Sequence, residues 1–247
     1  MSLDHLDYLD HLRGDADAVA NAVAVGDPDA PIAGCPGWTL SALVAHLGTV
    51  HRWARAAVIM GGPPTLEHEA DPAPTDPAAM AQWLRDGVDR LVASLREVDP
   101  EAPTWHPFPV EPRVAGLWRR RQAQETFVHR IDAEMAIGRT PVIDAALAAD
   151  GVDEYWTVML PRLLSRERLT TPPSIVAVHL TDRAGEWVAD GRSGRVVLDP
   201  SAAPSATISG DAATVLLRLW GRPVGGSAIT VSGDAAAADA WLALGGA

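Results

Sequence analysis

The chain is poor in residues that could cross-link it or bind polyanions. Its 247 residues include one cysteine, Cys35, and no lysine, and its 20 arginines are outnumbered by 32 acidic residues. A single cysteine excludes an intramolecular disulfide and any cysteine-rich zinc module. The formal net charge of -12 argues against nucleic acid and anionic membranes as partners, because both require cationic residues.

Long apolar runs and a basic amino-terminal segment are missing as well. No stretch approaches the ~18 consecutive apolar residues of a transmembrane helix, so no membrane partner is expected. The first residues, Met1–His5, have neither the basic start nor the apolar core of a signal peptide. We therefore expect a cytoplasmic protein. The lack of lysine beside abundant alanine, arginine, glycine, proline and aspartate is typical of a GC-rich genome.

The first half of the sequence has four stretches in which apolar residues recur every three or four positions, as in amphipathic helices. Thr39 and Asp76 suit the N-cap positions of the second and third of these. Amphipathic helices joined by loops predict a four-helix bundle. The expected helices cover residues 3–26, 39–61, 76–98 and 114–137.

The second half changes to strand-forming segments after one or two short helices. Strands are expected near residues 174–180, around Trp187 and at 195–198. Residues 206–213 and 229–236 repeat one pattern, a short strand, a glycine, an aspartate at an N-cap and a helix. The fold class is therefore predicted to be α+β, with a helical bundle over residues 1–145 and a smaller α+β domain over 146–247.

Three residues form a candidate metal site in the predicted bundle. His46 lies on the apolar stripe of the second helix, while Glu125 and His129 are one turn apart on the fourth. Three nitrogen and oxygen donors with one open position are typical of catalytic Zn²⁺. His51 competes with His46, but five residues turn a helix by ~500°, so the two point about 140° apart. His46 is preferred for its apolar neighbours, and His51 is the alternative.

Other polar residues allow less specific predictions. Cys35 has no obvious base beside it and is expected to be a small buried residue. Asp132 is interpreted as an outer partner of the metal site, or as a charge for Arg130. The run Arg119–Arg121 is expected to be a solvated face, with anion binding as the alternative. His106, in a proline-rich loop, is expected at the surface.

Two segments resemble the actinobacterial family of mycothiol-dependent maleylpyruvate isomerases. They are Cys35–Gly48, which reads CPGWTLSALVAHLG, and Gln124–Asp132, which reads QETFVHRID. Short matches in the second half, at residues 210–211, 219–222 and 232–234, agree with it. The resemblance implies a DinB-like four-helix bundle, with a divalent metal, usually zinc, on His46, Glu125 and His129. It also implies a carboxyl-terminal domain similar to sterol-carrier proteins.

The same resemblance implies mycothiol as a thiol cosubstrate. A free thiol is mostly protonated at neutral pH, and a metal makes it a thiolate. The expected function is cis–trans isomerisation of a small electrophile, or transfer of the thiol to it. Arg222 is the candidate catalytic residue that binds the substrate, with a surface cation at a helix end as the alternative. The competing hypothesis is a non-catalytic metal- and ligand-binding protein.

Overall fold

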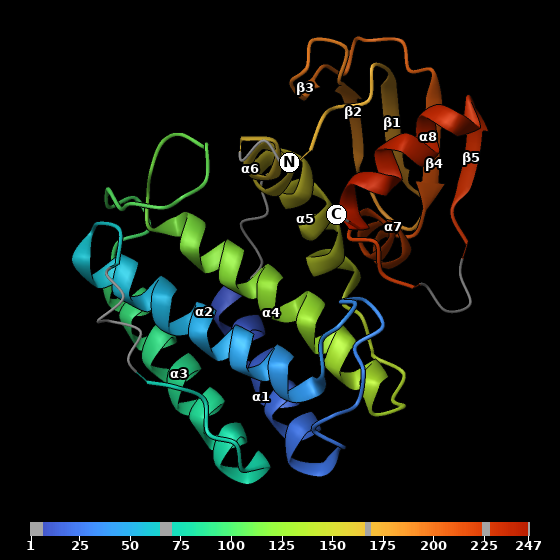
Figure 1. Cartoon of the computed structure of the whole chain (residues 1–247). Coiled ribbons are helices and arrows are strands. Elements are labelled where there is room, and N and C mark those ends of the chain that lie inside the picture. The colour runs from blue at the N-terminus through green and yellow to red at the C-terminus, as the bar shows by residue number, and fades with distance from the viewer. Residues whose placement is uncertain (1–6, 65–70, 166–168, 224–227, 247) are drawn as a thin grey trace. The chain divides into compact units, whose positions relative to one another are not determined.

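The computed structural model describes residues 7–64, 71–165, 169–223 and 228–246. They divide into two compact units. The helical unit comprises the described residues up to 106 together with 111–142. The second unit comprises 107–110 and the described residues from 143 onward. The expected α+β class, a helical region followed by a mixed α and β region, is confirmed (Figure 1).

Four long helices build the first unit. They are α1 (Tyr8–Val25), α2 (Leu40–Met60), α3 (Pro77–Glu97) and α4 (Gly116–Ala136). α1 and α2 each pack against both α3 and α4, so the helices alternate around the bundle (Figure 1). Apolar residues spaced three and four apart close its core. All four expected helices are therefore present; the start of the first expected one, residues 3–6, lies outside the described residues.

Polar side chains cap the amino-terminal ends of three of these helices. Asp7, Thr39 and Asp76 each accept a hydrogen bond from a backbone N–H in the first turn of the following helix. A helix leaves its first N–H groups without internal partners, and such caps satisfy them. The predicted caps Thr39 and Asp76 are thus confirmed.

A very close approach joins α2 to α3. The ring of Trp83 lies so near Gly48 that a Cβ atom built there would stand 2.1 Å from a ring carbon. Only a residue without a side chain allows this contact. The approach fixes the register of α2, the helix that carries His46 and His51.

The second unit starts with a helical segment and continues into a five-stranded sheet. α5 (Ala145–Glu154) passes through a π-helical turn, Tyr155–Met159, into α6 (Leu160–Ser165). The sheet order is β3-β2-β1-β4-β5, with β1 and β4 parallel and every other pair antiparallel. The strands are β1 (Ile175–Leu180), β2 (Glu186–Asp190), β3 (Val197–Leu198), β4 (Ala206–Gly210) and β5 (Thr230–Gly233).

The repeated sequence pattern corresponds to two strand–helix pairs. β4 leads through Asp211 into α7 (Ala212–Leu219), and β5 leads through Asp234 into α8 (Ala235–Leu242). Each aspartate caps its helix by accepting a hydrogen bond from a backbone N–H. A 3₁₀ turn, Ala243–Gly246, follows α8. The repeat therefore predicts the local structure of both copies correctly.

Aromatic side chains fill the core of the second unit. The rings of Trp156 and Trp241 lie 5.6 Å apart, and those of Tyr155 and Trp220 lie 5.4 Å apart. Burial raises the pKa of the Tyr155 hydroxyl. These contacts place the helical segment α5–α6 and the helices α7 and α8 in one core. None of the described helices combines the length and apolarity that a membrane span requires.

Candidate metal centre

The second and fourth helices bring three donor side chains together. His46 extends from α2, and Glu125 and His129 extend from adjacent turns of α4. Their donor atoms all lie within 4.8 Å of one another. The structure thus assembles the three residues that the sequence analysis selected, although residue 46 is about eighty positions from the other two.

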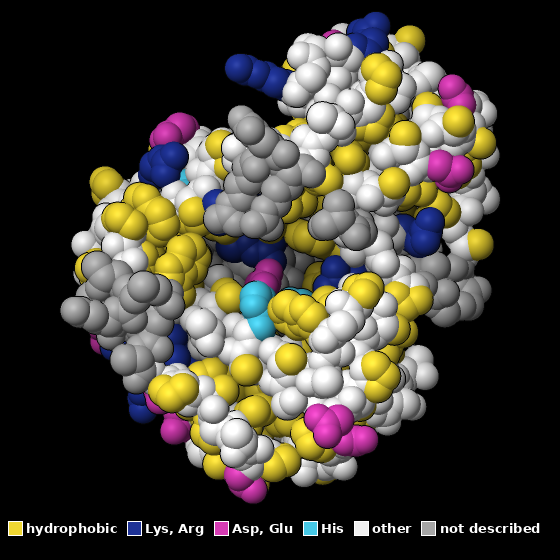
Figure 2. All heavy atoms as spheres, in the orientation of Figure 1, with side chains coloured by type: hydrophobic (Ala, Val, Ile, Leu, Met, Phe, Trp, Pro, Cys, Tyr) yellow, Lys and Arg dark blue, Asp and Glu magenta, His cyan; other side chains and the backbone are white. Residues whose placement is uncertain are grey.

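One carboxylate oxygen of Glu125 lies close to both imidazoles of this donor set. Glu125 Oε1 lies 3.1 Å from His46 Nε2 and 3.6 Å from His129 Nε2. Two donors bound to one Zn²⁺ at about 2.1 Å in tetrahedral geometry stand about 3.4 Å apart. The side chain of His46 is 35% exposed and that of Glu125 is 20% exposed. Histidine atoms beside an acidic side chain are visible in the space-filling view (Figure 2).

The second oxygen of Glu125 is held by a buried arginine. Arg121, one turn earlier on α4, donates to Glu125 Oε2 at 2.6 Å, and its side chain is only 3% exposed. Burial opposes ionisation of Glu125, but the charge of Arg121 and hydrogen bonds with His129 and His46 outweigh it. Together they hold the pKa of the Glu125 carboxyl well below its usual value. Glu125 therefore presents a charged oxygen to the two imidazoles.

Asp132 orients the imidazole of His129. Its Oδ2 lies 3.1 Å from His129 Nδ1, so that Nε2 faces Glu125. Burial disfavours a charged imidazole, but the bonds with Asp132 and Glu125 outweigh it and raise the pKa of His129. A carboxylate on the rear nitrogen of a histidine is a common outer partner of metal ligands. The alternative for Asp132 is wrong, because Arg130 pairs with Asp15 and Glu134 instead.

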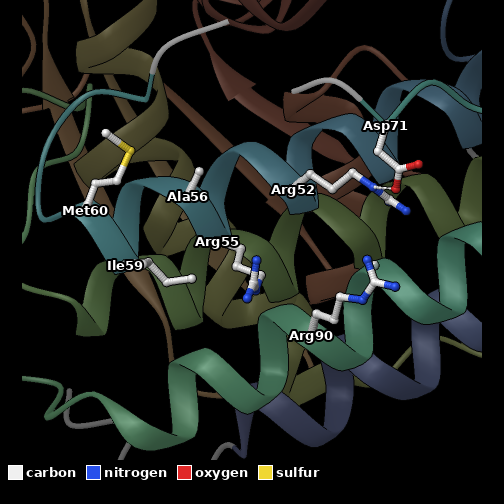
Figure 3. A pocket seen from close by; sticks show the side chains of 8 residues that line it. Arg52, Arg55, Ala56, Ile59, Met60, Asp71 and Arg90 are labelled. Carbon is white, nitrogen blue, oxygen red and sulfur yellow. Dashed lines mark hydrogen bonds and ion pairs between the residues drawn. The ribbon is translucent and has the colours of Figure 1, made fainter. Parts of the chain in front are cut away.

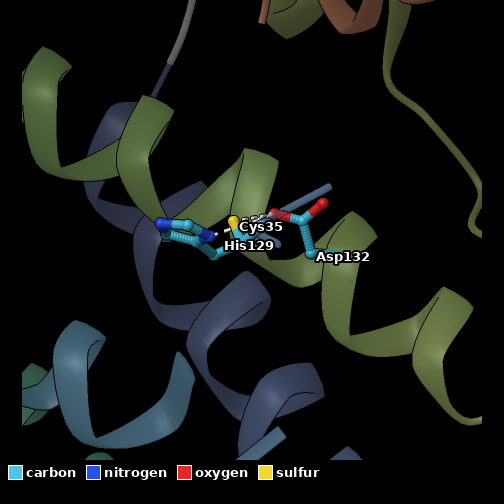
Figure 4. Close-up of side chains that lie close together, drawn as sticks. All are labelled: Cys35, His129 and Asp132. Carbon is cyan, nitrogen blue, oxygen red and sulfur yellow. Dashed lines mark hydrogen bonds and ion pairs between the residues drawn. The ribbon is translucent and has the colours of Figure 1, made fainter. Parts of the chain in front are cut away.

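Cys35 lies beside this pair, contrary to the expectation of a buried residue without a base. The residue is half-buried, and its Sγ is 3.9 Å from Asp132 Oδ2. Figure 4 shows Cys35, His129 and Asp132 converging, and their donor atoms form a second group within 4.8 Å. The expectation fails because Cys35 and Asp132 are 97 positions apart in sequence. Only the folded chain brings them together.

His51, and not His46, is the histidine of α2 that faces the core, so the reason for preferring His46, its apolar neighbours, is wrong although His46 is the one beside Glu125. His51 is fully buried, and its Nε2 lies 2.9 Å from Thr126 Oγ1. The hydroxyl of Thr126 donates to the carbonyl of Gln122, so it accepts from His51 Nε2. Burial lowers the pKa of His51 to about 3, which keeps the ring neutral. Among the described residues, the metal-binding groups include His46 and not His51.

An aromatic ring borders the two histidines of the donor set. The Trp38 ring meets His46 edge-on at 4.8 Å and stacks on His129 at 6.1 Å. Trp38 comes from the loop before α2, directly ahead of the cap Thr39. Packing against one rigid ring restricts the orientation of both imidazoles. The sequence analysis did not single out Trp38 as a residue of the site.

Two expectations about polar residues of the helical unit are wrong. The run Arg119–Arg121 is not a solvated face, since Arg121 is buried and Arg119 donates to the carbonyls of Leu95 and Val98. His106 is fully buried rather than at the surface. Three consecutive residues point in different directions around a helix, so a run of arginines cannot all face water when the helix is packed on several sides.

Arg222 belongs to the second unit. It follows α7 directly after Gly221, whose φ of 67° reverses the chain there. The residue is 9% exposed, and its guanidinium donates to the carbonyl of Trp220. Arg222 therefore bonds the end of α7, as the alternative of a helix-end cation expected, although it is buried rather than at the surface.

The donor set suits a divalent metal ion. Two imidazoles and a carboxylate form the mixed nitrogen and oxygen set that catalytic zinc sites use. The carboxylate is charged, Asp132 fixes one imidazole from behind, and part of His46 faces solvent. Three protein donors with an accessible side leave room for a further ligand on such an ion.

Comparisons with known proteins agree with this architecture. The model for the mycothiol maleylpyruvate isomerase N-terminal domain matches residues 9–134, and that for the MDMPI C-terminal domain matches 146–240. Crystal structures of the mycothiol-dependent maleylpyruvate isomerase and of a mutant of it resemble this chain with TM-scores of 0.60 and 0.61. Each shares 15% identity and aligns over 93% of both chains, which shows a common fold. A search of curated proteins gave no match.

Proposed function

Because the chain belongs to the mycothiol maleylpyruvate isomerase family, we propose that it is a metal-dependent enzyme that uses mycothiol to isomerise a small electrophile. The observation that carries the proposal is the convergence of His46, Glu125 and His129 on one partly exposed point. The preferred ion is Zn²⁺, because the donors are two neutral nitrogens and one carboxylate oxygen. A bound divalent cation lowers the pKa of a thiol and so supplies a thiolate at neutral pH.

The chain's own residues would hold and shape this centre. His46 and His129 would hold the ion through Nε2, and Glu125 would hold it through Oε1, the atoms that face one another. Arg121 occupies the other Glu125 oxygen, which favours binding through a single oxygen. Asp132 keeps His129 in the orientation that directs Nε2 to the centre.

The reaction needs a nucleophile that adds reversibly to a conjugated double bond. The thiolate sulfur forms a bond to one alkene carbon, and an electron pair moves onto the conjugated carbonyl oxygen. The former double bond is then single and rotates. Return of the electron pair breaks the carbon–sulfur bond and releases the trans isomer with the thiolate, so nothing is oxidised or reduced. If the carbon–sulfur bond persisted and the adduct took up a proton, the outcome would be transfer of the thiol.

Arg222 enters the proposal as the residue that binds a carboxylate of the electrophile. A guanidinium presents two parallel N–H groups that match a carboxylate. Replacement by alanine is expected to lower turnover with maleylpyruvate while metal content stays the same. Unchanged turnover of Arg222→Ala would remove Arg222 from the proposed catalytic residues.

Metal content and thiol titration test the proposal together. The purified wild type is expected to contain about one metal ion per chain and to bind mycothiol in a calorimetric titration. His129→Ala should lose both properties, whereas His179→Ala, which removes an exposed histidine from β1, should keep both. The wild type is also expected to convert maleylpyruvate only when mycothiol is present.

Three outcomes contradict the proposal in different ways. Absence of metal from the wild type would overturn the metal-dependent mechanism. Bound metal without thiol binding would favour the competing function of a non-catalytic metal-binding protein. Thiol consumption with accumulation of an adduct would identify transfer rather than isomerisation.

A further inference from the structure

A second concave site lies on the helical unit, between α2 and α3. The pocket has a volume of ≈ 290 Å³, near the lower end for small-molecule sites. Its lining shares no residue with His46, Glu125 and His129. The lining residues are Arg52, Arg55, Ala56, Ile59, Met60, Asp71, Gly87 and Arg90.

Three arginines stand around this pocket, in a chain whose net charge is -12. Figure 3 shows Arg52 and Arg55 extending from α2 and Arg90 extending from α3. Burial, and to a smaller degree the charge of Arg90, lowers the pKa of Arg52, while Asp71 opposes this effect. Two guanidinium groups are thus close enough to repel each other. Asp71 offsets this repulsion at Arg52, with which it forms an ion pair at 2.8 Å.

Arg52 is the fixed member of the group. It donates to Asp71 and to the carbonyls of Gly48 and Trp83, and its guanidinium lies 3.8 Å above the Trp83 ring. Gly87 makes room for it, since a Cβ there would stand 2.4 Å from the guanidinium. Arg52 therefore forms a rigid positive wall and has few donors left for a ligand.

Arg55 and Arg90 supply the available donors. Arg55 uses Nε to bind Ser94 Oγ, and Ser94 in turn donates to the carbonyl of Arg90, which ties both arginines to one point of α3. Within the described ranges, the terminal nitrogens of Arg55 and the Arg90 guanidinium have no hydrogen-bond or ion-pair partner. Asp86, the nearby carboxylate one turn before Arg90, accepts from the amide of Gln82. The two arginines can therefore bind an oxyanion from two sides.

An apolar wall adjoins these donors. Ile59 is 57% exposed and Met60 is 44% exposed, and Ala56 lies between them and the arginines on α2. Large apolar side chains at an exposed helix end gain free energy when a ligand covers them. An oxyanion bound to the arginines without an apolar part would leave these side chains in water, whereas a ligand with a short hydrocarbon chain would cover them.

We propose that the pocket between α2 and α3 binds an organic carboxylate with a short apolar chain. The carboxylate lies between Arg55 and Arg90, and the chain packs on Ile59 and Met60. This site is separate from the proposed metal centre, so the inference does not depend on the proposed function.

Hexanoate is a suitable probe, and the full chain is titrated by calorimetry and by ligand-observed NMR. A ligand of this size is expected to bind with a Kd of about 1 mM. Arg90→Gln and Arg55→Gln should each weaken binding about tenfold. Arg96→Gln, which removes an exposed arginine of the same helix α3, is the matched control and should bind normally. Because Arg90 is exposed, its replacement leaves the fold intact, as circular dichroism will verify.

The apolar half of the site has its own test. Ile59→Ser should weaken hexanoate about threefold or more and leave the weaker binding of acetate unchanged. Equal binding of hexan-1-ol and hexanoate would overturn the proposal, and so would normal hexanoate affinity in Arg90→Gln. Inorganic phosphate binding more tightly than hexanoate would show a site for the head group alone, which contradicts the inference. Metal content and mycothiol binding should stay unchanged in all these variants, so failure here is distinct from failure of the proposed function.

Discussion

His46 and His51 lie on the same helix but differ in every neighbour that matters for metal binding. His46 reaches Glu125 Oε1 and is partly exposed, whereas His51 is buried against Thr126. His46→Ala is therefore expected to lose the metal, as measured by elemental analysis after dialysis. His51→Gln, which keeps a polar group toward Thr126, should retain it. Loss of metal in His51→Gln with retention in His46→Ala would reverse the assignment.

The buried His51 gives the metal-free protein a specific dependence on pH. The pKa of His51 is about 3 in the folded chain, whereas the ordinary value for a histidine is 6.5. Between these values the unfolded chain binds more protons, so stability from His51 is complete above pH 6.5 and declines as the pH falls toward 3. The slope approaches roughly 1.4 kcal/mol per pH unit.

Urea unfolding of metal-free wild type and His51→Gln between pH 7 and 5 measures this effect. The wild type should lose more free energy of unfolding than the variant over that interval. Glu125 adds its own loss only below its ordinary pKa of 4.5. His129, whose pKa is raised, contributes with the opposite sign in this interval, but it is present in both proteins, so the difference between the two curves reports on His51. Parallel curves for the two proteins would contradict the assignment of a neutral buried His51.

Arg121 is expected to control how readily Glu125 binds a cation in acid. Its charge is the main factor that holds the Glu125 pKa below the usual value against the opposing effect of burial. In Arg121→Gln that pKa rises, protons compete better, and zinc affinity should fall about tenfold. The loss should grow as the pH decreases from 7 to 5. Arg139→Gln, at the exposed end of the same helical region, is the control, and an equal loss there would exclude a specific role for Arg121.

The contact between α2 and α3 leaves no room for an added methyl group at Gly48. Gly48→Ala places a Cβ 2.1 Å from a carbon of the Trp83 ring and should destabilise the fold by about 1–3 kcal/mol. Gly14→Ala adds the same group on α1, where nothing lies within 4 Å, and should stabilise the helix by about 0.5–1 kcal/mol. Thermal unfolding followed by circular dichroism compares the two. A destabilised Gly14→Ala or an unaffected Gly48→Ala would contradict the described packing.

The starts of several helices could be predicted from the sequence. Thr39, Asp76, Asp211 and Asp234 each cap the helix that follows, because a cap acts on N–H groups two or three residues away. Strand pairing was not predicted. β1 pairs in parallel with β4, about thirty residues later, and antiparallel with β2. That choice depends on how the whole sheet buries its faces, which short sequence windows do not contain.

At the scale of the whole molecule, metal binding and folding stability are linked. An ion that binds the folded chain at 100 times its Kd stabilises it by about 2.7 kcal/mol. Zn²⁺ should therefore raise the free energy of unfolding of the wild type, measured by urea titration with circular dichroism at matched ion concentrations. His129→Ala should show no increase. An equal increase in His129→Ala would place the stabilising ion elsewhere.

The sequence alone determined what depends on local spacing and on composition. Glu125 and His129 share a helix face because they are four residues apart, and the amphipathic stretches and caps define the helices. The mycothiol-dependent maleylpyruvate isomerase family was likewise readable from two short segments and is confirmed.

Only the tertiary structure decided which distant residues meet. It paired His51 with Thr126, joined Cys35 to Asp132 across 97 positions, and turned Arg121 inward to Glu125 while Arg55 and Arg90 line a separate pocket. The physical reason is that a side chain's partner depends on which helix faces it. That arrangement follows from burying the apolar surfaces of all the helices at once, so no local pattern of arginine, cysteine or histidine contains it.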